Sequence, residues 1–341
     1  MEGSGGTDDT IRHWGAGIYS VDSGYIRAKF DAIHLIVERG RAAIVDSATS
    51  HSVPRVLAAL DAVGVGRDQV DWVLLTHVHL DHAGGAGALL RELPAARLTV
   101  HPRGRRHMVD PSKLWQATIA VYGKAQAESL YGEIVPIAAE RIVETGEGAT
   151  IDLAGRRIEF IDTPGHARHH VVLRDTATGH LFAGDMFGVS YRELDVHGRP
   201  FVIPSSTPVQ FDPDDSLRSI ERMLALAPQA IYLTHFAEVR HIPQLGQQLQ
   251  RHVRRYAEIA TAAVEAERTI DGGTIEATLG ARPGPIQQRI DEGLKALYLA
   301  DLRAHGSTLS DEAIWSLLEM DLRLNSAGLV DWLRGRAGRQ R

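Results

Sequence analysis

Short apolar segments rich in β-branched residues recur through the first two thirds of the chain. This pattern is typical of the strands of an α/β protein. The segment at residues 70–75 is almost continuously apolar, as expected of a strand buried on both faces. The pattern predicts strands at residues 17–21, 32–37, 42–45, 70–75 and 97–100, and again at 150–153, 157–161, 171–174, 181–183 and 230–233.

Apolar residues at helical spacing lie between several of these strands. Ser52 is a good N-cap with Pro54 in the first turn, so a helix is expected from there. Further helices are expected over residues 86–93, over 111–130 and from about 214.

The pattern changes from about Pro243 onward, where only helical spacing is found. It predicts helices at residues 286–299, 311–322 and 327–333. We therefore expect a flexible N-terminus at residues 1–14, a main α/β domain at 15–242 and a helical extension at 243–341. The extension either covers a site on the main domain or forms a homodimer interface, and the sequence leaves both open.

The composition is that of an ordinary globular protein. Hydrophobic residues make up 44% of the 341 residues and charged residues 23%. The formal net charge of −6 gives no reason to expect nucleic acid as a partner. No apolar run approaches the ~18 residues of a membrane span, so no membrane partner is expected. The first residues are acidic and glycine-rich, unlike a secretory signal, so the expected location is cytoplasmic.

Two residue counts narrow the chemistry. The chain has no cysteine, which excludes disulfides, thiolate catalysis and sulfur-ligated metal sites. It has 17 histidines, and histidine is the commonest metal ligand. Any transition metal would therefore be held by nitrogen and oxygen atoms.

Four candidate ligands follow the apolar segment at 70–75 within six residues: His77, His79, Asp81 and His82. The carboxyl ends of strands are where α/β sheets build their sites. His77 and His79 alternate, so in extended backbone they point the same way. Glycines 84 and 85 follow, and we expect them to let the backbone pass close to bound ions.

Three further candidates each lie just beyond an expected strand, namely His166, Asp185 and His235. All seven donors are imidazoles or carboxylates. Such a set suits two ions a few ångströms apart, in a site of the hydrolytic two-metal kind.

This pattern resembles the metallo-β-lactamase superfamily over residues 15–240. The resemblance rests on the complete H-x-H-x-D-H motif at residues 77–82, followed by His166, Asp185 and His235 in the family's order. It implies an αββα sandwich carrying the helical extension. It implies that His77, His79 and His166 bind a first metal, that Asp81, His82 and His235 bind a second, and that Asp185 bridges them.

The resemblance also implies a function. We expect a dinuclear metal-dependent hydrolase that acts on a small ester, thioester or lactone through a metal-bridging hydroxide, with similarity to the glyoxalase II and lactonase branches. Two divalent ions are expected as cofactors, with zinc as the default and iron or manganese as alternatives. Asp81 is expected to orient the hydroxide or to shuttle a proton. Asp46 resembles the family's aspartate that orients a metal-binding histidine.

Other side chains are weaker candidates. Tyr191 lies six residues beyond Asp185 and is a candidate for polarising a substrate carbonyl, with ordinary packing as the alternative. His169 is a candidate for supporting the ligand His166. Trp115 and Tyr122 share a helix face that either covers the site or belongs to the core.

Three other functions stay open at this stage. The first is a mononuclear iron oxygenase similar to the persulfide dioxygenases, which use the same fold with fewer ligands. The second is a non-catalytic or regulatory metal-binding module of that fold. The third is phosphodiester cleavage.

Overall fold

The computed structural model describes residues 10–339, which divide into two compact units. Unit 1 comprises the chain up to Asp162 together with Val171–Gly184 and Gln229–Val239. Unit 2 comprises Thr163–His170, Asp185–Pro228 and the chain from Arg240 onward. Each unit is therefore built from separate stretches of sequence, and the predicted domain boundary near residue 242 stays a prediction.

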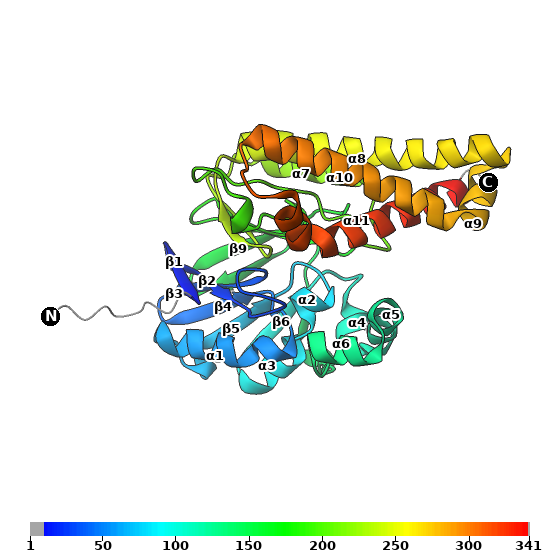
Figure 1. Cartoon of the computed structure of the whole chain (residues 1–341). Helices are drawn as coiled ribbons and strands as arrows, with labels where there is room; N and C mark the ends of the chain where they lie inside the picture. The colour runs from blue at the N-terminus through cyan, green and yellow to red at the C-terminus, as the bar shows by residue number, and fades with distance from the viewer. Residues whose placement is uncertain (1–9, 340–341) are drawn as a thin grey trace. The chain divides into compact units, whose positions relative to one another are not determined.

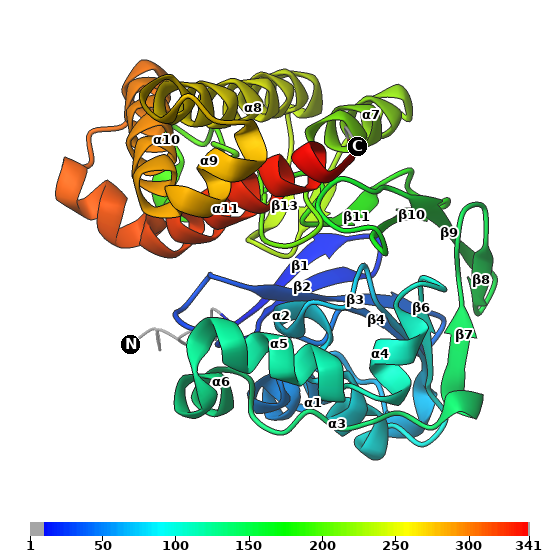
Figure 2. The same ribbon diagram turned by 90° about the vertical axis from the view of Figure 1, so that its right-hand side faces the viewer.

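The first sheet of unit 1 has seven strands in the order β1-β2-β3-β4-β5-β6-β7 (Figures 1 and 2). Strands β1 to β4 pair antiparallel, and β4 to β7 pair parallel. The strands are β1 (Ile11–Gly15), β2 (Ile18–Asp22), β3 (Ala32–Glu38), β4 (Arg41–Val45), β5 (Val70–Leu74), β6 (Arg97–Val100) and β7 (Ile142–Glu144).

The second sheet also belongs to unit 1 and has six strands in the order β13-β12-β11-β10-β9-β8. All its pairs are antiparallel except β11 with β12. The strands are β8 (Thr150–Leu153), β9 (Arg156–Asp162), β10 (Val171–Asp175), β11 (Leu181–Gly184), β12 (Ile231–Leu233) and β13 (Ala237–Val239).

Two apolar clusters hold unit 1 together. One joins the two sheets, with Ile36, Val45 and Leu74 from the first and Phe160 and Phe182 from the second. The other joins the opposite face of the first sheet to α1 and α3, which lie along that face in Figure 1. The helices of this unit are α1 (Val53–Ala62), α2 (Leu80–Ala83), α3 (Ala86–Glu92), α4 (Arg105–Val109), α5 (Ser112–Tyr122) and α6 (Lys124–Tyr131). Burial of these side chains is the main force that closes the sandwich of two sheets.

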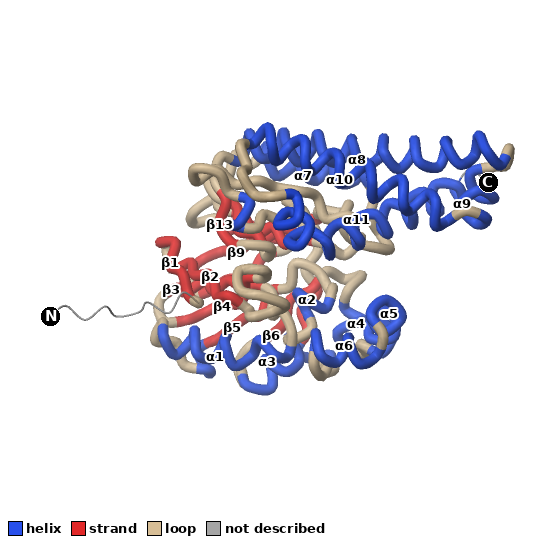
Figure 3. Tube along the Cα trace, viewed as in Figure 1, coloured by secondary structure: helices blue, strands red, loops and turns tan. Residues whose placement is uncertain are grey.

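Unit 2 is mainly helical, as Figure 3 shows for the C-terminal part of the chain. Its helices are α7 (Pro213–Ala225), α8 (Ile242–Asp271), α9 (Ile275–Ala281), α10 (Pro283–His305) and α11 (Asp311–Arg339). Helix α10 buries residues at positions 286, 290, 294, 298 and 302, the spacing that predicted a helix there. A polar cluster lies among these apolar contacts: Asn325 donates to the hydroxyls of Tyr256 and Tyr298.

The predicted fold class is confirmed, because two mixed sheets with flanking helices precede a helical C-terminal region. Between residues 10 and 339, no helix combines the length and the apolar character that crossing a bilayer requires.

Three local predictions differ from the structure. Residues 11–15 form strand β1 instead of a flexible tail, because they pair with β2, while residues 1–9 lie outside the described part. The single helix expected at 111–130 is two helices, α5 and α6, because Gly123 adopts a positive φ of 77° between them. The two helices expected at 311–322 and 327–333 are one, α11.

Helix α11 offers a test of the packing in unit 2. A Cβ at Gly328 would lie 1.5 Å from the backbone oxygen of Ser206, so the helix cannot keep its position with a side chain there. We expect Gly328→Ala to lower the free energy of unfolding by about 3 kcal/mol, as measured by chemical denaturation.

The matched control is Gly335→Ala on the same helix, where a Cβ would have no atom within 4 Å. Alanine is the better helix former, so this variant should be neutral or more stable by up to ~1 kcal/mol. Equal effects of the two substitutions would contradict the described packing of α11.

Candidate metal centre

The carboxylate of Asp46 organises the candidate site in unit 1. Asp46 follows β4 directly and is 1% exposed. It accepts hydrogen bonds from the backbone nitrogen of Thr76 (2.8 Å), from the Thr76 hydroxyl (2.9 Å) and from the Thr234 hydroxyl (3.1 Å). It therefore ties together the segments that follow β4, β5 and β12.

The same carboxylate holds His82. The Nδ1 atom of His82 lies 2.8 Å from Oδ2 of Asp46, and a carboxylate at that distance can only accept, so Nδ1 carries the proton. This is the contact expected of a residue that orients a metal-binding histidine. It leaves the lone pair of His82 on Nε2.

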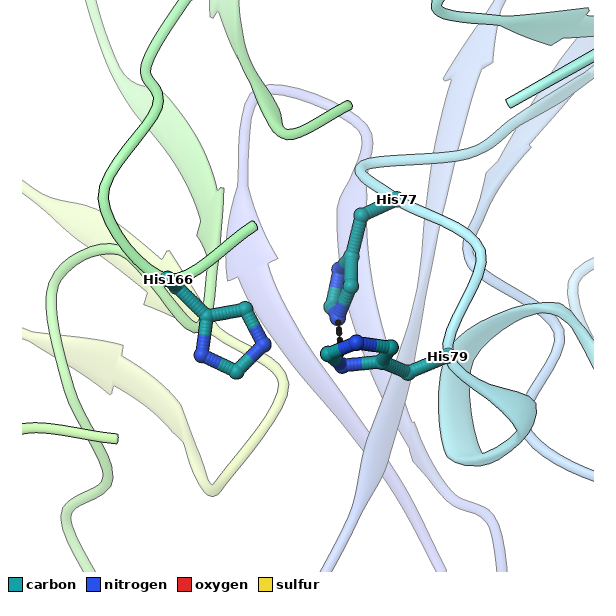
Figure 4. A group of neighbouring side chains, drawn as sticks. All are labelled: His77, His79 and His166. Atoms are coloured by element: carbon teal, nitrogen blue, oxygen red, sulfur yellow. Dashed lines mark hydrogen bonds between the residues drawn. The ribbon is translucent and has the colours of Figure 1, made fainter. Parts of the chain in front are cut away.

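His77 is oriented by the same carboxylate through one intervening hydroxyl. Its Nδ1 lies 3.1 Å from the Thr76 hydroxyl oxygen. The Thr76 hydroxyl has one proton and donates it to Asp46, so it must accept from His77. The lone pair of His77 is therefore also on Nε2, which lies 3.0 Å from Nδ1 of His79 (Figure 4).

His235 is fixed from another direction. Its Nδ1 donates to the backbone oxygen of Phe30 at 3.0 Å, which again leaves the lone pair on Nε2. The Nε2 atoms of His82 and His235 lie 3.9 Å and 3.6 Å from Oδ2 of Asp81.

These three side chains fit a metal ion. The ligand atoms of Asp81, His82 and His235 all lie within 4.8 Å of one another. Two ligand atoms at ~2.1 Å from a tetrahedral zinc lie about 3.4 Å apart. The spacing in this group is slightly wider than that, and too long for hydrogen bonds. The side chain of Asp81 is 27% exposed, so the group is open to solvent on that side.

Gly85, the second glycine after His82, lies close to a neighbouring backbone segment. A Cβ at Gly85 would lie 2.5 Å from the backbone oxygen of Thr49 and 2.6 Å from that of Ser47. The close approach is therefore to the segment that follows Asp46. There Ser47 donates from its backbone nitrogen to the backbone oxygen of His82 at 2.7 Å. This contact requires glycine at position 85, and the predicted approach of the backbone to bound ions stays a prediction.

Unit 2 contains the other two predicted ligands, His166 (also labelled in Figure 4) and Asp185. Nδ1 of His166 donates to the backbone oxygen of Ser205 at 3.1 Å, and its Nε2 lies 3.5 Å from Oδ2 of Asp185. The hydroxyl of Ser205 donates to the same carboxylate oxygen at 3.1 Å. This pair thus repeats the arrangement of unit 1, with Nδ1 held and Nε2 directed at a carboxylate.

His170 contacts the backbone of the predicted ligand Asp185. His170 accepts from the backbone nitrogen of Asp185 at 3.3 Å, and its other ring nitrogen lies 3.0 Å from the Thr163 hydroxyl. His169 is buried, and its support of His166 stays a prediction.

Tyr191 is 1% exposed, and its hydroxyl donates to the carboxylate of Asp321 on α11. To polarise a substrate carbonyl it would have to give up that hydrogen bond. Its role toward a substrate also stays a prediction.

Sequence reasoning missed Asp31. Its carboxyl group is fully buried, and neither oxygen has a hydrogen-bond partner among the described residues. Burial raises its pKa to about 8, although His235 and His82 nearby act in the opposite direction. The available signal was an acidic residue directly before a buried strand, which by itself is also typical of a turn.

Comparison with known proteins gives the family. The sequence model described as "Metallo-beta-lactamase superfamily" matches residues 31–235, more than half of the chain. The match includes all seven predicted ligands.

Individual relatives agree with this match. The chain is 30% identical over 173 residues to "Metallo-beta-lactamase fold-containing protein ST1585" of Sulfurisphaera tokodaii, covering 49% of this chain and 61% of that protein. It is 28% identical over 235 residues to a "Hydroxyacylglutathione hydrolase" of Acidiphilium cryptum, covering 69% of this chain and 74% of that one. The match therefore covers less than two thirds of the length of ST1585.

Solved structures support the same assignment. The crystal structure of ST1585 from Sulfolobus tokodaii superposes with a TM-score of 0.57 at 25% identity, covering 71% of this chain and 86% of that one. A metallo-beta-lactamase family protein from Thermus thermophilus shares the fold with a TM-score of 0.54 at 23% identity, covering 85% of this chain and 94% of that one. The chain belongs to the metallo-β-lactamase superfamily.

Proposed function

We propose that the protein is a hydrolase with two metal positions that acts on a small ester, thioester or lactone. Membership of the superfamily supports a metal-dependent hydrolase at that general level. The observation that carries the proposal is the shared orientation of His82 and His235. Each has its Nδ1 proton committed to an oxygen acceptor and its Nε2 lone pair directed at Asp81.

We assign Asp81, His82 and His235 to one metal position. His77, His79 and His166 are assigned to the other, with Asp185 shared. Connectivity supports this assignment, because Thr163–His170 is a short loop joined at both ends to strands of unit 1, β9 and β10. Asp185 directly follows β11, whose Gly184 pairs with Leu233 of β12, two residues before His235.

When bound, divalent cations in such a set supply Lewis acidity and lower the pKa of water toward neutrality. The residues of the chain supply the rest. Asp46 keeps His77 and His82 in the tautomer that presents Nε2, so these ligands need no reorientation on binding. Asp81 is the partly exposed carboxylate of its group and can accept a proton during attack on the substrate carbonyl.

Hydrolysis is the first test of this proposal. Zinc-loaded protein should turn over at least one member of a panel of 4-nitrophenyl acetate, a glutathione thioester and a γ-lactone. His82→Ala should lower kcat/KM at least 100-fold, because it removes a metal ligand and the contact with Asp46. His51→Ala, which removes an exposed histidine of the same unit, should leave the rate unchanged.

Three outcomes would count against the proposal. Equal turnover by the wild type and His82→Ala would mean that the activity does not come from this site. A fully metal-loaded protein without turnover would favour the alternative function, a non-catalytic or regulatory metal-binding module of the same fold. Exclusive turnover of bis(4-nitrophenyl) phosphate would replace the ester assignment with phosphodiester cleavage.

Asp46 gives a prediction about metal affinity. Asp46→Asn weakens the acceptor that fixes two histidine tautomers, so zinc should bind roughly 10- to 100-fold more weakly in a competition titration with a chromophoric chelator. Asp71→Asn is the matched control, because Asp71 of β5 pairs with Arg41 of β4 and both side chains are partly exposed. Unchanged affinity in Asp46→Asn, or the same loss in Asp71→Asn, would refute the role of Asp46.

The raised pKa of Asp31 can be tested through the pH dependence of protein stability, which requires no turnover. In the metal-free folded protein its pKa is about 8, against ~3.9 in the unfolded chain. Between these values the folded state holds a proton that the unfolded state has released, so stability falls as the pH rises toward 8. Asp31→Asn removes this pH-dependent contribution to stability, because asparagine does not titrate.

The stability of Asp31→Asn relative to the wild type should therefore rise by roughly 1 to 3 kcal/mol between pH 6 and pH 8. Urea denaturation of the metal-free proteins at the two pH values measures it. A difference between the two proteins that does not change with pH would show that Asp31 titrates normally.

A further inference from the structure

A row of aromatic rings leads away from the metal ligand His235 within unit 1. The ring of Phe30 lies 5.4 Å from that of His235, and Tyr25 lies 5.8 Å from Phe30. Tyr131 of α6 lies 5.6 Å from Tyr25, and Tyr122 of α5 lies 6.0 Å from Tyr131. These centroid distances are those of packed aromatic pairs, so the five rings form one continuous contact chain.

The row ends on an unusual helix. None of the residues in Ser112–Tyr122 is fully buried, although α5 carries apolar side chains at helical spacing. Trp115, Ile119 and Tyr122 share one face and are all half-buried. Leaving such a face partly in water forgoes the free energy of burying it, so the face is available to an apolar ligand.

The hydroxyl groups of the row also lie beside the site. Those of Tyr25 and Tyr131 are hydrogen-bonded to each other, and both groups feel the charge of Asp81. A phenol is ordinarily protonated at neutral pH, so these hydroxyl groups present no charge to a substrate. The row is therefore apolar and neutral along its whole length, and it begins at a ligand of the proposed metal centre.

We propose that the row from Phe30 to Tyr122, with the α5 face that continues it, binds an apolar substituent of the substrate. The substrate class is then an ester or thioester that carries an aromatic ring or an alkyl chain of several carbons. This inference rests on the proposed hydrolase function and makes its substrate specific. Trp115 and Tyr122 are the residues that determine specificity.

The test compares substrates that differ only in apolar length. Each buried methylene contributes about a fourfold preference, so 4-nitrophenyl hexanoate should exceed 4-nitrophenyl acetate in kcat/KM by at least tenfold. A second series, with a constant acetyl group and ethyl, hexyl or benzyl alcohols, covers the other side of the ester bond. Selectivity in either series supports the proposal, and its absence from both overturns it.

Variants on α5 then locate the selectivity. Tyr122→Ala and Trp115→Ala should each lower the ratio of the longer to the shorter substrate at least fivefold, mainly through KM. Val121→Ala is the matched control, because Val121 lies on the same helix but is 57% exposed, off the face that carries Trp115 and Tyr122. A ratio that stays at its wild-type value in both Tyr122→Ala and Trp115→Ala would overturn the proposal, whereas the hydrolase function would stand.

A binding measurement keeps the two proposals separable. Isothermal titration of the zinc-loaded protein with 4-phenylbutyrate needs no turnover. We expect Tyr122→Ala to weaken binding at least fivefold and Val121→Ala to leave it unchanged. If the wild type hydrolyses nothing, this pattern would still support the aromatic row, and identical binding by the wild type and Tyr122→Ala would overturn it.

Discussion

The Asp46 carboxylate is the group on which the other contacts of the candidate site in unit 1 depend. It ties together the chain segments after β4, β5 and β12, and it sets the tautomers of two histidines. His82 is set directly and His77 through the single proton of the Thr76 hydroxyl. Under the proposed assignment, in which His77 and His82 belong to different metal positions, one buried carboxylate would orient a ligand of each. A buried acid of this kind is tolerable only because each of its oxygens is hydrogen-bonded.

Two further histidines also have their Nδ1 proton held by a fixed acceptor, which here is a backbone oxygen. His235 is held by a backbone oxygen of unit 1, and His166 is held by a backbone oxygen within unit 2. Neutral imidazole has one proton, and a fixed acceptor at Nδ1 places the lone pair on Nε2. In the proposed metal centre each histidine would meet an ion with its ring already oriented, so less conformational entropy would be lost on metal binding. This requirement explains why the ligands lie just beyond strands, where backbone carbonyls and buried carboxylates are rigidly positioned.

The sequence predicts most of the strands and the fold class well, for identifiable reasons, whereas the seven metal ligands stay predictions. Strands such as β4 and β5 are largely apolar, and Asp46 and His77 stand out within three residues after them. Features set by tertiary contacts are not predictable in this way. Strand β1 is polar, so the sequence predicts a flexible tail there, and only its pairing with β2 shows that it is a strand. The end of α5 at Gly123 depends on one positive φ angle. The sequence does not distinguish Asp31 from an aspartate in a turn. Only the structure shows that its carboxyl group is buried without a hydrogen-bond partner among the described residues.

Asp31 and α5 depart from the rules of stable folding in opposite ways, since one buries a polar group and the other leaves apolar groups half-exposed. Such departures are expected at functional sites, where stability is given up for chemistry. Asp31 is close enough to His82 and His235 to feel their charge, and α5 is joined to His235 through the row of aromatic rings. Bound cations would offset the cost of burying Asp31, because their positive charge favours its ionised form. An apolar substituent would offset the exposure of α5. Both departures are therefore consistent with the proposed complex, in which a metal centre and an apolar ligand would be present together.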